Sequence, residues 1–129
     1  MNFVADTHAL IWWFTGSPKL GIEASKIFEE CENGECVIFI PSIVMAEALG
    51  IFDKKHVSFD FKKLLKQIND SKHFVLVALD YPVLQKMTDL KDVPELHDKI
   101  IASTAKYLNL PIITKDKHLQ TRLHIKTVW

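Results

Sequence analysis

Hydrophobic residues along this chain fall into short continuous runs that alternate with stretches of helical periodicity. The short runs are typical of strands covered on both faces, because such strands have no polar side to expose. They predict five strands, at residues 3–5, 37–40, 74–79, 111–114 and 125–128.

The stretches between these runs have apolar residues three or four positions apart, the spacing of an amphipathic helix. Ser42 and Asp80 are residues that favour helix N-caps, and Pro82 suits a first helical turn. The pattern predicts helices at residues 9–16, 22–31, 42–52, from 61 to near 69, from 81 onward and at 96–108.

Strands separated by helices predict an α/β fold, with a mainly parallel sheet of four to five strands covered by helices on both faces. In such open sheets the ligand site lies beyond the carboxyl ends of the strands. Asp6 and Asp116 lie just after the first and fourth predicted strands. They are therefore candidates for a site before any chemistry is considered.

Composition limits the class of protein. The chain has 129 residues, 48% of them hydrophobic and 25% charged, which predicts one globular domain spanning residues 1–129. Sixteen basic and sixteen acidic side chains give zero net charge, so no overall field attracts nucleic acid or a membrane. Any affinity for a polyanion must be local.

Two cysteines, Cys31 and Cys36, are too few for a disulfide framework, and we expect free thiols. No further Cys pair or His-x₃₋₅-His spacing stands nearby, which disfavours zinc. The apolar runs are too short for a membrane span, and Asp6 interrupts any signal-peptide core. These features predict a cytoplasmic protein that does not enter a membrane.

Glu47 is the only charged residue in the apolar segment 42–52, which predicts that it belongs to a buried helix. An unpaired carboxylate there would cost roughly several kcal/mol. A metal, a basic partner or protonation would each offset this cost. The alternative is that Glu47 lies at a helix edge that reaches water.

Asp98 begins an apolar stripe that continues at Ile101 and Ala105, so its side chain is expected to point inward. The alternative is an acid stabilised by the positive end of the helix dipole. Asp92 and Glu95 lie off the stripe and are interpreted as solvated or capping groups around Pro94.

Asp6 and Asp116, taken singly, are also suited to be helix N-caps. Together with Glu47 and Asp98 they would form a set of four carboxylates that repel one another unless cations neutralise them. Hard oxygen ligands favour Mg²⁺ or Mn²⁺. Such a site suits hydrolysis of a phosphodiester bond. The chain lacks Gly-x-Gly-x-x-Gly, P-loop and Gly-x-Ser-x-Gly motifs, so the sequence does not favour the rival chemistries that depend on these motifs.

Four segments carry a family resemblance: VADTHALIWW at 4–13, PSIVMAE at 41–47, HDKIIASTA at 97–105 and IITKD at 112–116. Their order and spacing resemble a PIN domain, and more closely the VapC-type toxins of bacterial toxin-antitoxin pairs. The resemblance runs from Asp6 to Trp129. It implies a three-layer α/β/α sandwich and Mg²⁺- or Mn²⁺-dependent endoribonuclease activity. It also implies a cognate antitoxin that blocks the site, and a homodimer.

Carried over by position, the resemblance implies an acidic tetrad that is both catalytic and metal-binding. Family members differ in how many of the four acids bind metal. Thr7 and Thr114 would be supporting hydroxyls. The implied tetrad consists of Asp6, Glu47, Asp98 and Asp116.

Basic residues flank Asp116, and Lys115, Lys117 and Arg122 are candidates to bind RNA phosphates. The alternative is a solvated turn of mixed charge. His8 and His97 adjoin tetrad acids, but single histidines are more often structural or exposed, so neither is assigned as a base.

Trp12 and Trp13 are adjacent in a predicted helix and point about 100° apart, so both cannot easily face one core. One of them is a candidate for a dimer or antitoxin surface.

Among rival enzymes, haloacid-dehalogenase-like phosphatases usually carry a second Asp where this chain has His8. A receiver-like phospho-acceptor would use Asp80, which instead suits a helix cap. The main alternative is a non-catalytic PIN-like module that binds RNA or protein.

Overall fold

A five-stranded, all-parallel sheet forms the centre of the structure, a computed structural model that describes residues 1–129. The strands lie in the order β3-β2-β1-β4-β5. The first strand is therefore central, and the chain adds strands on one side of it before it crosses to the other. The strands are β1 (Phe3–Ala5), β2 (Ile38–Pro41), β3 (Phe74–Val77), β4 (Ile112–Ile113) and β5 (Thr127–Val128).

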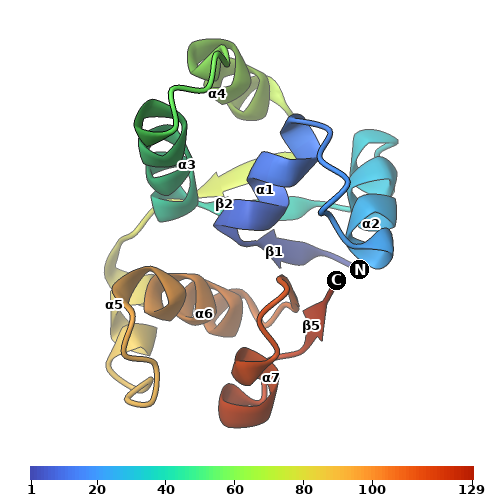
Figure 1. The fold of residues 1–129 in the computed structure, drawn as a ribbon. Coiled ribbons are helices and arrows are strands. Elements are labelled where there is room, and N and C mark those ends of the chain that lie inside the picture. Colours follow the sequence, from blue (N-terminus) through green and yellow to red (C-terminus); the bar gives the residue numbers. More distant parts are fainter.

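Helices cover both faces of this sheet. Right-handed crossovers place α1 to α4 on one face and α5 to α7 on the other, because the direction of strand addition reverses after β3. In Figure 1, α1 crosses in front of the strands, α1 to α4 occupy the upper half of the view and α5 to α7 the lower half. The predicted α/β sandwich with a parallel sheet is confirmed. The helices are α1 (Thr7–Phe14), α2 (Ile22–Glu32), α3 (Ser42–Lys54), α4 (Phe61–Asp70), α5 (Tyr81–Met87), α6 (Leu96–Leu108) and α7 (His118–Leu123).

The core lies between the sheet and the helices. Val4, Ile38 and Ile112, from three neighbouring strands, are fully buried. The face of α2 predicted from its periodicity, which includes Ile27 and Phe28, packs against them. Burial of this apolar surface is the main stabilising contribution to the fold.

Several boundaries differ from the predictions. The third, fourth and fifth strands are shorter than their apolar runs, because pairing continues only where a neighbouring strand runs alongside. Ser42 was expected to cap α3, but Pro41 occupies the cap position and no side chain caps this helix. The short helix α7 was foreseen only as a possible helix after Asp116.

Cys31 and Cys36 are buried free thiols, as expected. The Cys31 thiol donates to the His73 carbonyl oxygen at 3.0 Å, and burial raises the pKa of Cys31 to about 12. The protonated form is therefore strongly favoured, and neither thiol is suited to nucleophilic chemistry. None of the helices combines the length and the apolar character that crossing a membrane requires.

Candidate functional site

The central strand β1 places Asp6 at the carboxyl edge of the sheet, where the strand order reverses. The Asp6 backbone N–H donates to the Ile113 carbonyl oxygen at 3.2 Å, which joins Asp6 to the end of β4. Thr114 follows β4 and is buried. This position is the switch point at which open parallel sheets bind their ligands.

Asp6 is an N-cap, as the alternative interpretation proposed. Its Oδ1 accepts a hydrogen bond from the Ala9 N–H at 2.9 Å and so caps α1. Burial raises the pKa of Asp6 above its ordinary value, and the negative charge of Glu47 raises it further. Hydrogen bonds from the Thr114 hydroxyl and the Ala9 N–H lower the pKa but do not cancel the rise. Asp6 therefore caps α1 and also experiences the negative charge of Glu47 on α3.

Asp98, in the first turn of α6, is surrounded by negative charge. Its side chain is half-buried at the start of the predicted inward stripe, with Ile101 and Ala105 buried behind it. Burial is the first cause that raises the pKa of Asp98, and four negative charges add to it. In decreasing order these are the charges of Glu95, Asp116, Asp6 and Glu47. The structure therefore brings all four sequence-predicted acids into one electrostatic neighbourhood.

Glu47 reaches this neighbourhood from α3. Its side chain is 26% exposed, and Leu49 and Gly50 on the same helix are exposed. The expectation that Glu47 belongs to a buried helix was wrong, because the outer face of α3 is apolar in composition but uncovered. Glu47 instead lies at a helix edge, with Oε2 at 3.2 Å from Nδ1 of His97.

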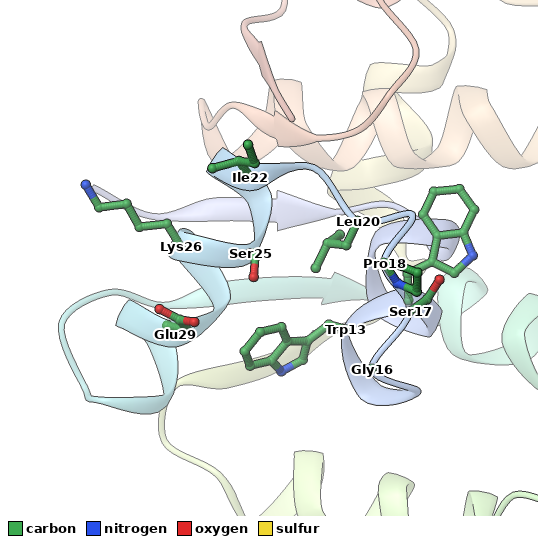
Figure 2. Close-up of a pocket in the computed structure, with 10 residues that line it drawn as sticks. Trp13, Gly16, Ser17, Pro18, Leu20, Ile22, Ser25, Lys26 and Glu29 are labelled. Atoms are coloured by element: carbon green, nitrogen blue, oxygen red, sulfur yellow. The ribbon is translucent and has the colours of Figure 1, made fainter.

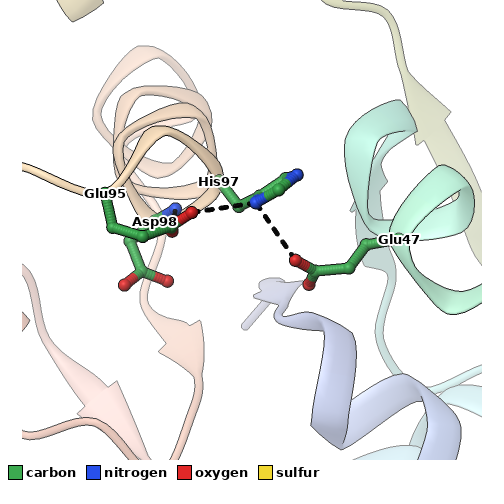
Figure 3. A network of polar contacts seen from close by, with 4 residues as sticks. All are labelled: Glu47, Glu95, His97 and Asp98. Atoms are coloured by element: carbon green, nitrogen blue, oxygen red, sulfur yellow. Dashed lines mark hydrogen bonds and ion pairs between the residues drawn. The ribbon is translucent and has the colours of Figure 1, made fainter. Parts of the chain in front are cut away.

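His97 contacts two carboxylates, a contact that sequence reasoning missed. Its Nδ1 is 2.9 Å from Oε1 of Glu95, the N-cap of α6, as well as 3.2 Å from Glu47 (Figure 3). The other Glu95 oxygen, Oε2, accepts the Asp98 N–H at 2.8 Å. Burial raises the pKa of Glu95, but N–H donation from Asp98 and His97 outweighs it and the pKa is lowered. The interpretation of Glu95 as a capping group is confirmed.

Asp116 lies in the turn between β4 and α7. Its N–H donates to the Thr114 hydroxyl at 3.1 Å, and its Oδ1 accepts the His118 N–H at 2.9 Å. Lys117, not Asp116, is the N-cap residue of α7. Asp116 therefore stabilises the turn before the helix and is not the N-cap itself.

A cavity of about 170 Å³ opens beside Asp98 and Asp116, between the start of α6 and α7. Arg122 lines it, while Lys115 and Lys117 are exposed in the turn nearby. None of these three cations takes part in an ion pair in the structure. Positive charge is thus available at the acidic edge for a ligand that carries negative charge.

The donor atoms fit a hard cation in kind, although no three Asp, Glu, His or Cys side chains form a metal-binding group in this structure. Carboxylate oxygens prefer Mg²⁺, Mn²⁺ or Ca²⁺. Burial is the main cause that raises the pKa values of Asp6 and Asp98, and neighbouring carboxylates add to it, so a cation bound there would favour the ionised forms. Beside Asp6, the Thr7 hydroxyl is buried and has no hydrogen-bond partner, the only such side-chain atom in the structure. A buried hydroxyl of this kind suits a bound water or ion.

The largest cavity lies elsewhere, between α1 and α2. It measures about 680 Å³ and contains none of the four acids (Figure 2). Trp13, on its wall, stacks on Phe28 at 5.2 Å between ring centroids, whereas Trp12 contacts Trp129 at 5.6 Å. The two adjacent indoles thus face different neighbours, as their angle on the helix predicted, and both are partly exposed.

Comparisons with known proteins agree with this fold. The chain resembles a solved structure described as VapBC2 from Rickettsia felis bound to a DNA fragment from their promoter, with a TM-score of 0.75 and 16% identity, over 99% of this chain and 98% of that chain. It also resembles a toxin-antitoxin complex from Klebsiella pneumoniae, with a TM-score of 0.69 and 20% identity, over 98% of this chain and 96% of that chain. A third is FitAcB from Neisseria gonorrhoeae (TM-score 0.68, 18% identity, 100% and 97%). No curated protein matches the sequence.

At these identities the structural neighbours establish the fold alone. The family model described as PIN domain, however, matches residues 3–123, nearly the whole chain. The matched region contains all four acids and both threonines. Sequence pattern, parallel sheet and family model agree, and the chain belongs to the PIN domain family.

Proposed function

We propose that this protein is a metal-dependent endoribonuclease and the toxin of a toxin-antitoxin pair. The single observation that carries the nuclease proposal is the position of Asp98, whose pKa is raised by burial and by the charges of Asp116, Asp6 and Glu47 among others. Four ionised carboxylates at one site repel one another, so a bound cation is needed to stabilise the state in which all four are ionised. PIN-domain membership and the resemblance to toxin-antitoxin structures support the same function.

In the proposed site, Asp6, Glu47, Asp98 and Asp116 hold Mg²⁺ or Mn²⁺. When bound, the metal lowers the pKa of a coordinated water and stabilises the leaving oxygen of the phosphodiester. The Thr7 and Thr114 hydroxyls orient the groups around Asp6. The side chains of Lys115, Lys117 and Arg122 bind RNA phosphates on either side of the cleaved bond and offset the repulsion between RNA and the acids.

The proposed partner is a cognate antitoxin protein, since one of the similar structures is described as a toxin-antitoxin complex. We also place the protein in the cytoplasm and expect a homodimer. Large apolar side chains are exposed on the edge strand β3 (Leu76), just after it (Leu79) and on α5 (Tyr81 and Leu84), and a second copy would cover them. Light scattering of the purified protein measures the oligomeric state, and a monomer at all concentrations would remove that part of the proposal.

The nuclease proposal is tested with the antitoxin-free protein and a mixed pool of single-stranded RNA, in Mn²⁺, Mg²⁺ or EDTA. We expect cleavage in either metal and none in EDTA. Asp6→Asn and Asp98→Asn should abolish cleavage, whereas Asp89→Asn, an exposed acid outside the site, should not. In cells, expression should arrest growth and Asp98→Asn should relieve the arrest.

The same assay separates the main alternative. A non-catalytic PIN-like module would bind the RNA pool without cutting it in any metal. Equal cutting by the wild type and Asp6→Asn would indicate a contaminating nuclease and leave this site without activity.

A further inference from the structure

The acid at the helix edge, Glu47, has one polar partner in the structure. That partner is Nδ1 of His97, at 3.2 Å from Glu47 Oε2. His97 stands in the first turn of α6, directly before Asp98, and Figure 3 shows its ring between the carboxylates of Glu95 and Glu47. The contact therefore joins the side chains of α3 and α6 across the acidic edge of the sheet.

The chemistry of the contact fixes which atom is the donor. Ionised carboxylates only accept hydrogen bonds, so a ring nitrogen placed between two of them must carry the hydrogen. His97 thus donates from Nδ1 to Glu95 Oε1 at 2.9 Å, while Glu47 Oε2, at 3.2 Å from the same nitrogen, lies within ion-pair distance without a hydrogen bond of its own. The shorter contact makes Glu95 the principal acceptor and anchor of the ring.

Glu95 is itself held in place. Its Oε2 accepts the Asp98 N–H at 2.8 Å, which caps α6, while Oε1 accepts from His97. Both oxygens of the anchor are therefore engaged. Glu47, by contrast, has a long side chain that is partly exposed, and without His97 its carboxylate would be free to rotate into solvent.

We infer that His97 is a positioning residue: anchored by Glu95, it holds the Glu47 carboxylate at the acidic edge so that Glu47 Oε1 remains available to a divalent cation. This inference rests on the proposed metal-dependent function, but concerns a residue outside the acidic tetrad. Mutation of the outer-shell groups that orient metal ligands generally costs about 10–100-fold in metal affinity. His97 acts through Glu47 and needs no contact with RNA.

The test of this inference is the affinity of the RNA-free protein for Mn²⁺, measured by calorimetry or from the EPR signal of free Mn²⁺. His97→Ala should weaken binding about 10–100-fold. His97→Asn should restore most of the loss, because its amide N–H lies near the position of Nδ1. The matched control is His124→Asn: His124 is exposed, does not line the cavity beside Asp98 and Asp116, and has a left-handed conformation (φ 53°) that Asn tolerates.

A thermodynamic cycle checks that the effect passes through Glu47. In the Glu47→Ala background, which keeps three acids, His97→Ala should change Mn²⁺ affinity by less than about twofold. Thermal unfolding in EDTA should be nearly the same for wild type and His97→Ala, because an exposed ion pair contributes little to stability. If the contact only clipped α3 to α6, His97→Ala and Glu47→Ala would instead lower stability in EDTA by similar amounts.

The outcomes separate this inference from the proposed function. If wild type and His97→Ala bind Mn²⁺ equally, the positioning role is wrong while the metal-dependent function stands. If His97→Asn is as impaired as His97→Ala, the donor at Nδ1 is not what matters and the inference fails. Absence of Mn²⁺ binding by the wild type would overturn both.

Discussion

Replacement of Asp98 by Asn should change stability in opposite directions without and with a divalent metal. Burial and four neighbouring charges raise the pKa of Asp98. The folded state therefore holds the Asp98 proton more tightly than the unfolded state, and stability falls as the pH rises through the ordinary pKa towards the raised one. Above the raised pKa this penalty is complete. In EDTA, Asp98→Asn removes the charge and should raise the free energy of unfolding.

Metal reverses the order. At a Mn²⁺ concentration 100 times the dissociation constant, binding adds about 2.7 kcal/mol to the stability of the wild type. An unfolding entropy of about 2.1 cal/mol/K per residue, over 129 residues, gives about 0.27 kcal/mol/K, so the expected rise in Tm is about 10 °C. If Asp98→Asn weakens binding about tenfold, the gain falls to about 1.4 kcal/mol and 5 °C.

The measurement is thermal unfolding followed by circular dichroism, in EDTA and over a Mn²⁺ titration, with Asp89→Asn as the control. Asp89 is exposed in the loop after α5, so its variant should follow the wild type in both conditions. A wild-type Tm that does not respond to millimolar Mn²⁺ would refute the reasoning. So would an Asp98→Asn protein that is less stable than the wild type in EDTA.

Gly21→Ala should destabilise the protein by about 1–3 kcal/mol, because the added Cβ would collide with the backbone and ring of Trp129. Urea unfolding measures this loss, and an unchanged urea midpoint would contradict that packing. Phe28→Ala should cost about 3–5 kcal/mol in the same assay, since its ring is fully buried between two other aromatic rings, and Phe28→Leu should cost less. Cys31 and Cys36 should react with a thiol reagent only on unfolding, because both are buried; rapid labelling of the folded protein would contradict this.

The helix with a recognisable capping residue at each end was predicted well. The helix expected at residues 96–108 is α6 with the same bounds, because Glu95 is a capping residue and Asn109 tolerates the left-handed conformation that ends the helix. The strands β4 and β5 were predicted too long, because apolar runs mark buried segments whereas strand pairing depends on the neighbouring strand.

Within the candidate site, the sequence identified residues that directly follow a strand, such as Asp6, and an acid that begins an inward stripe, Asp98. It overestimated the burial of Glu47, since an apolar helix composition does not say which face is covered. The contact between His97 and Glu47 could not be predicted, because it joins two helices that are fifty positions apart in sequence and is visible only once they pack. Glu95 at the cap position was the one local signal of it.

The central place of β1 in the sheet has a consequence for biosynthesis. This strand is translated before the other four, yet its neighbour β4 is translated more than one hundred residues later, and the four carboxylates are spread from Asp6 to Asp116. A growing polypeptide that has not passed Asp116 has neither the full sheet nor all four acids. Under the proposed function, a chain that stops short of Asp116 cannot cut RNA, so the ribosome and the message that produce it are spared until Asp116 has been translated.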